Sequence, residues 1–108
     1  MNSIIAELIS WASKNECELR KNGIHLTKNF PEEQSKFPWK ASLGFEKNDL
    51  VASYTMWERN GLQTELIIVD GSAGRTLLTE DGNPESPGIV GIDLGNLVRM
   101  LLNPTKQF

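Results

Sequence analysis

Apolar residues near the start of the chain recur at the spacing of an amphipathic helix. Between residues 2 and 22 they fall on one helical stripe, while the polar residues lie mostly elsewhere. The stripe consists of Ile4, Leu8, Trp11, Ala12 and Leu19. Gly23 follows at the position where a helix commonly ends in a left-handed residue. We therefore expect an N-terminal helix that packs through Trp11 onto a sheet.

A second pattern of helical period lies near the end of the chain. Its apolar stripe contains Leu94, Leu97, Val98 and Leu101. The predicted helix begins near residue 91 or 93 and ends at residue 102, because Asp93 can cap it and Pro104 cannot continue it. The preceding residues 79–88 are rich in turn-forming residues, and we expect them to form a loop.

Between these helices, apolar and polar residues alternate as they do in half-buried strands. In residues 37–46 one face carries Phe37, Trp39, Ala41, Leu43 and Phe45. Further strand-like segments span residues 24–27, 50–59, 62–69 and 76–79. Asn60-Gly61 is a signal for a two-residue type I′ hairpin. The sequence predicts an α+β fold, an antiparallel meander of about five strands with the N-terminal and C-terminal helices packed on one face.

The segment Asp70-Gly71-Ser72-Ala73-Gly74-Arg75 follows an apolar strand and raises the question of phosphate binding. A Walker loop needs a lysine and then a helix, because the helix N-terminus and the lysine together hold the phosphates. Here a strand-like segment follows instead, at residues 76–79. We therefore predict a turn in which the glycines adopt positive φ and Asp70 accepts backbone N–H groups.

Length and charge narrow the classes of function. The 108 residues fit a single domain, residues 1–108. The lone Cys17 cannot form an internal disulfide, and no leader-like or membrane-spanning run occurs, so we expect a cytoplasmic protein without a membrane partner. Eleven basic and fourteen acidic residues give a net charge of -3. Nucleic acid is disfavoured as a partner, because its binding normally needs a basic patch.

Residue sets typical of enzymes or metal sites are missing from the sequence. His25 is the only histidine, and neither a Gly-x-Ser-x-Gly elbow nor a Cys/His cluster occurs. Four carboxylates could meet across the sheet, but chance proximity on a solvated face explains them better: Glu46, Glu58, Glu65 and Asp70. We expect no enzymatic activity, no metal and no cofactor.

Trp57 is the most informative of the three tryptophans. Trp11 and Trp39 are expected to face each other in the core, whereas Trp57 shares a strand face with polar residues. If the Tyr54 face packs under the helices, Trp57 lies on the open face, where an aromatic residue can anchor a partner. The alternative is a tryptophan covered by a neighbouring loop. The candidate partner-binding residues are Trp57, Glu58, Gln63, Glu65 and Asp70.

The order of these features resembles the TriTu family of immunity proteins from bacterial polymorphic toxin systems. The resemblance covers nearly the whole chain. In the first half of the chain it rests on a tryptophan in the first helix (Trp11), a strand with Ala and Ser after a proline (Pro38, Ala41, Ser42) and a strand ending in Thr-x-Trp (Thr55, Trp57). In the second half it rests on an acidic-aliphatic strand (Glu65 to Asp70), an Asp-x-x-x-Gly turn (Asp70, Gly74) and a leucine-rich last helix (Leu94, Leu97, Leu101).

The resemblance implies a small cytoplasmic α+β protein that binds and neutralises a cognate toxin in competition between bacteria. We expect it to be a monomer or a weak homodimer. A small acidic chaperone or adaptor for a secreted effector is the alternative, and it would usually be a stable dimer. A small enzyme or ligand binder is a third possibility, which a deep pocket with convergent polar groups would favour.

Overall fold

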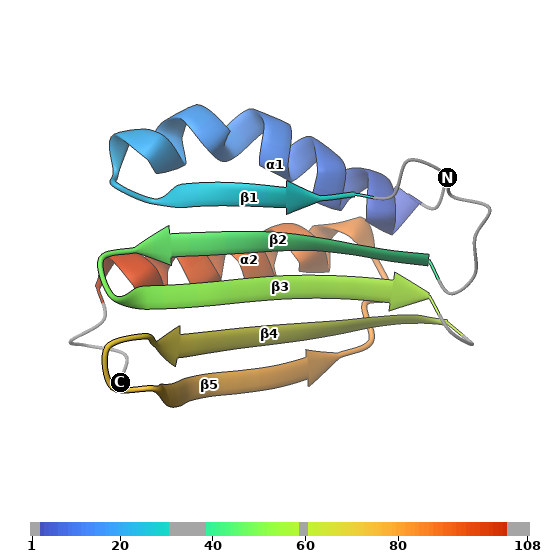
Figure 1. Cartoon of the computed structure of the whole chain (residues 1–108). Coiled ribbons are helices and arrows are strands. Elements are labelled where there is room, and N and C mark those ends of the chain that lie inside the picture. The colour runs from blue at the N-terminus through green and yellow to red at the C-terminus, as the bar shows by residue number, and fades with distance from the viewer. Residues whose placement is uncertain (1–2, 31–38, 59–60, 104–108) are drawn as a thin grey trace.

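A helix, five strands and a second helix follow one another along the chain (Figure 1). The computed structural model describes residues 3–30, 39–58 and 61–103. The elements are α1 (Ser3–Lys21), β1 (His25–Asn29), β2 (Trp39–Lys47), β3 (Leu50–Glu58), β4 (Leu62–Asp70), β5 (Arg75–Gly82) and α2 (Pro87–Leu102).

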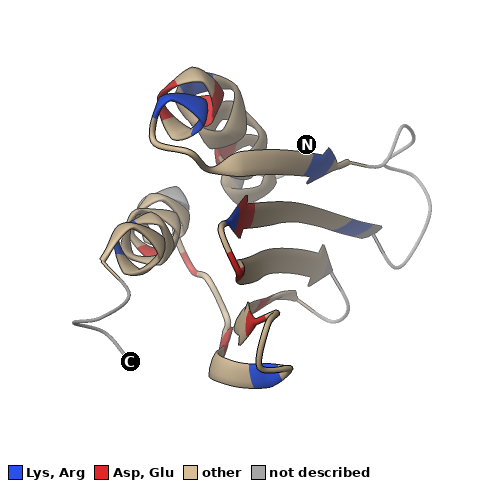
Figure 2. Ribbon diagram, turned by 60° about the vertical axis from the view of Figure 1, so that its left-hand side comes forward, with Lys and Arg blue, Asp and Glu red and all other residues tan. Residues whose placement is uncertain are grey.

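The five strands form one antiparallel sheet in the order β1-β2-β3-β4-β5, so each strand pairs with its neighbours in sequence. Both helices lie on the same side of this sheet (Figure 2), and α1 packs against α2 and β1. The predicted α+β meander is therefore confirmed. The helices cover one face because alternate strand residues are apolar there, and burial of apolar area is the main stabilising term.

The core lies between this sheet face and the helices. The central strands contribute buried Ala41, Leu43, Phe45, Ala52, Tyr54, Met56, Leu66 and Ile68. The helices contribute Ile4, Ile5, Leu8, Ala12, Leu19, Val90, Leu94, Leu97 and Leu101, so the stripes expected from the sequence face the core. Trp11 packs edge-on against Phe45, with ring centroids 6.2 Å apart. The expected contact of Trp11 with Trp39 involves a side chain outside the described part of the structure.

Two boundaries differ from the sequence-based prediction. Residues 79–82 belong to β5, because they pair with residues 64–67 of β4, so the loop before α2 is shorter than expected. The helix α2 begins at Pro87, with Ser86 rather than Asp93 in the N-cap position. Proline is favourable in a first helical turn, where its missing N–H has no partner to lose.

The β3–β4 hairpin also differs from the prediction. Glu58 pairs with Leu62, which leaves three residues between the paired positions instead of the two of a type I′ hairpin. Gly61 takes φ of +113°, a value open to glycine because it has no Cβ. Arg59 and Asn60 lie outside the described residues.

Candidate functional site

Trp57 lies on the sheet face opposite the helices. On β3 the buried residues are Ala52, Tyr54 and Met56, so Trp57 points the other way, as the alternation predicts. Its register partner is Gln63 on β4, and the indole Nε1–H donates to Gln63 Oε1 at 2.9 Å. The ring is half-buried, and this hydrogen bond fixes its orientation.

A groove beside this ring has a volume of about 420 Å³. We call it the tryptophan groove and define it by its lining residues Trp57, Gln63, Thr64, Glu65, Asp81, Gly82 and Asn83. Glu65 on β4 and Asp81 on β5 are register partners, so two carboxylates stand directly opposite each other there. Among the described residues neither has an ion-pair partner. Like charges in such positions repel each other.

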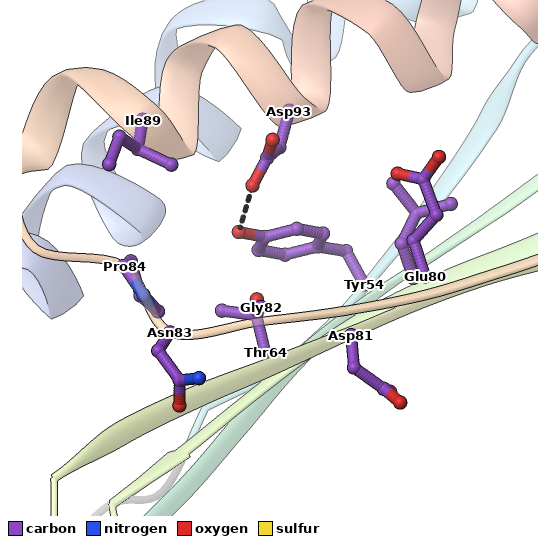
Figure 3. Close-up of a pocket in the computed structure, with 10 residues that line it drawn as sticks. Tyr54, Thr64, Glu80, Asp81, Gly82, Asn83, Pro84, Ile89 and Asp93 are labelled. Carbon is purple, nitrogen blue, oxygen red and sulfur yellow. Dashed lines mark hydrogen bonds between the residues drawn. The ribbon is translucent and has the colours of Figure 1, made fainter.

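A smaller cleft, of about 170 Å³, lies on the helix side of the same strand ends (Figure 3). Tyr54 on β3 points toward α2, and its hydroxyl donates to Asp93 Oδ2 at 3.2 Å. Burial raises the pKa of the Tyr54 hydroxyl well above its ordinary value, and the charge of Asp93 raises this pKa further. The hydroxyl therefore stays protonated as a donor that ties β3 to α2.

Thr64 and Gly82 line both the tryptophan groove and the smaller cleft, and they form the last pair of the β4–β5 ladder. A Cβ atom on Gly82 would lie 2.9 Å from Thr64 Oγ1, closer than such contacts allow, so a glycine fits this position. After Gly82 the chain turns away from β4 toward α2. Because β4 and the chain after Gly82 separate there, the tryptophan groove and the smaller cleft both lie at this end of the sheet.

Asp70 lies apart from the tryptophan groove, at the opposite end of β4 from Gln63. The two residues are seven positions apart along the strand, roughly 23 Å at the usual rise. The Asp70 Oδ1 atom accepts from the Ser72 hydroxyl at 2.8 Å, the Ser72 backbone N–H at 3.0 Å and the Ala73 backbone N–H at 3.2 Å. The Ser72 hydroxyl bond, the largest of several causes, holds the pKa of Asp70 below its usual value.

The predicted turn at residues 70–75 is confirmed, because β5 and not a helix follows it. Of its two glycines, Gly74 adopts φ of +64° as expected. Gly71 does not have positive φ; its N–H donates to Asp49 O at 2.7 Å, and a Cβ would lie 3.1 Å from that oxygen. Close approach to the β2–β3 turn therefore explains this glycine.

The structure brings three of the five predicted site residues together: Trp57, Gln63 and Glu65 line one groove. Asp70 caps the distant turn, and the side chain of Glu58, at the end of β3, lies outside the described part. Asp81 was missed, because only the β4–β5 register places it opposite Glu65. The preference for chance proximity over a carboxylate site agrees with the register, in which the β3 partners of Glu46, Glu65 and Asp70 are Val51, Thr55 and Leu50. The side chain of Glu58, the fourth of these carboxylates, lies outside the described part.

Among the described residues, no three His, Cys, Asp or Glu side chains are grouped as metal ligands. No helix in the described ranges combines the length and apolarity of a bilayer span. Comparisons of the chain with protein-family models, curated proteins and solved structures give no match.

Proposed function

We propose that this protein is a non-enzymatic immunity protein that binds and neutralises a cognate bacterial toxin domain. The observation that carries the proposal is Trp57, held by Gln63 on the sheet face that no described element covers. Tryptophan is enriched among residues that dominate binding energy at interfaces. Because the hydrogen bond already orients the ring, little side-chain freedom is lost when a partner packs on it.

The charges beside Trp57 favour a basic partner. Glu65 and Asp81 are register partners on the uncovered face, so a lysine or arginine of the partner could pair with both carboxylates. The net charge of -3 would also speed the encounter with a basic toxin, such as a nuclease. The resemblance to TriTu immunity proteins supports the same class of partner.

The first test is protection. If a large protein with a variable C-terminal domain is encoded next to this chain, that domain is the toxin to coexpress with it in bacteria. We expect the wild-type chain to restore growth and to bind the purified domain in calorimetry. A chain that neither binds nor protects would contradict the proposed function.

The second test is the binding surface. The double variant Trp57→Ala, Glu65→Lys should keep the fold and weaken binding at least about tenfold, since it removes an aromatic anchor and reverses a charge. The matched control is Ile92→Ala, Glu18→Lys, which changes the same kinds of residue at exposed positions on the two helices. Unchanged affinity of a folded Trp57→Ala, Glu65→Lys variant, with protection intact, would show that another surface binds the toxin.

A further inference from the structure

The outer edge of β5 is open, unlike the other edge of the sheet. The strand β1 at the far edge contacts α1, and Lys28 Nζ pairs with Glu16 Oε1 of that helix at 2.9 Å. In space, no described strand or helix lies beside the outer edge of β5 (Figures 1 and 2). This edge is eight residues long and carries neither proline nor lysine, two residues that commonly block edge pairing.

A bulge in β5 decides which side chains share a face. Ile68 pairs with Leu78 and Val69 with Thr76, so Leu77 is an extra residue in the ladder. Beyond the bulge Arg75 pairs with Asp70, which puts it on the helix side with Leu78 and Glu80. By the same count Thr76 shares the open face with Thr79. Without the bulge, Arg75 and Glu80 would lie on opposite faces.

We propose that a second copy of this chain pairs with β5, antiparallel and about a two-fold axis, to form one sheet of two meanders. The register places Arg75 opposite Glu80 of the second copy and Thr76 opposite its Thr79. Symmetry repeats each pair, so two opposite-charge pairs and two threonine pairs flank the central Leu77 and Leu78. Arg75 and its partner Glu80 then share the helix side, and Thr76 and its partner Thr79 share the open face.

Neighbouring registers lack this match. A shift by one residue would set Arg75, on the helix side, opposite Asp81, on the open face. Arg75 is the register partner of Asp70 and attracts its charge, but no described ion pair includes Arg75 or Glu80, and both side chains are exposed. Two copies of this edge therefore complement each other, because opposite charges meet on the same side of the sheet. Six paired residues per copy make a small interface, so the dimer is expected to be weak.

The test is sedimentation equilibrium of the full chain from about 10 μM to about 1 mM, the range in which weak dimers dissociate. We expect association of the wild type. Arg75→Glu and Glu80→Arg should each weaken it by roughly tenfold, because each sets like charges opposite each other twice. The double variant Arg75→Glu, Glu80→Arg should restore it, since the pairs re-form with their signs exchanged.

Two controls keep the result specific. Arg99→Glu and Glu18→Arg make the same charge changes at exposed positions on α2 and α1, and association should stay at the wild-type level. Amide hydrogen exchange along β5 should slow as concentration rises, whereas exchange in β1 should not. A wild-type monomer at every concentration, or a double variant no better than the single ones, would overturn the proposal and leave the bulge as a device that protects the edge.

Discussion

Two aromatic residues three positions apart on β3 have opposite roles. Tyr54 points under α2, is buried and bonds Asp93, whereas Trp57 points to the uncovered face and bonds Gln63. Both polar groups are satisfied, as buried or half-buried aromatic hydrogen-bond groups usually are. One therefore belongs to the core and the other to the proposed binding surface.

The raised pKa of Tyr54 gives a prediction for alkaline solution. Because folding raises this pKa, the contribution of Tyr54 to stability is complete below the ordinary tyrosine pKa of about 10 and is lost as pH rises above it. At neutral pH, Tyr54→Phe should lower the free energy of unfolding by about 1 kcal/mol through the lost bond to Asp93. Above about pH 10 the difference from the wild type should shrink.

Urea unfolding of the two proteins between pH 7 and pH 11 measures this difference, over the range that contains the tyrosine pKa. Tyr54 is the single tyrosine of the chain, so the absorbance of tyrosinate reports its ionisation directly. Ionisation at the ordinary pKa while the protein is still folded would contradict the burial argument.

For single residues, the sequence predicted which face of the sheet a side chain lies on, but not which distant residue it contacts. Strict alternation along β3 is enough to place Trp57 opposite Tyr54. The bond from Tyr54 to Asp93 joins residues 39 positions apart, and neither local pattern nor propensity indicates such a pair. Asp81 was missed for the same reason, since its place beside Glu65 depends on the β4–β5 register.

At the scale of elements, glycines act differently in turns and in the last helix. Gly74 takes φ of +64° in the β4–β5 turn, where a Cβ would be strained. Gly95 is an exposed residue of α2, and an added Cβ would meet no atom within 4 Å. The same substitution should therefore have opposite effects at the two positions.

We expect Gly74→Ala to lower the free energy of unfolding by about 1 kcal/mol. Gly95→Ala should raise it by up to about 1 kcal/mol, because alanine loses less backbone entropy in a helix. Urea denaturation of both variants measures these changes. Equal effects of the same sign would mean that the backbone at one of the two positions differs from the structure described.

Element types were predicted correctly, whereas their ends were not. The apolar stripe of α2 was identified, yet its first turn was assigned to a loop, since proline and glycine near residue 87 resemble a turn. Tertiary packing outweighs this tendency, because Val90 is fully buried one turn before Leu94. Pairing with β4 similarly keeps residues 79–82 in β5.

The whole molecule is a sheet with one covered and one open face. The uncovered face carries the tryptophan groove, and the free edge of β5 borders it at Asp81. Binding of a partner on the face and pairing of two copies along the edge use different atoms of β5. The number of strands and their antiparallel order followed from alternation and turn signals, but which edge stays free required the packing of α1 on β1.

The contact between α1 and α2 also has a consequence for synthesis. A ribosome makes α1 before the five strands, whereas α2, which packs against α1, is made after them. Until α2 emerges, the side of α1 that packs against α2 lacks that cover. Nascent chains arrested before Pro87 should therefore be cut readily by protease within α1, and chains that include α2 should resist.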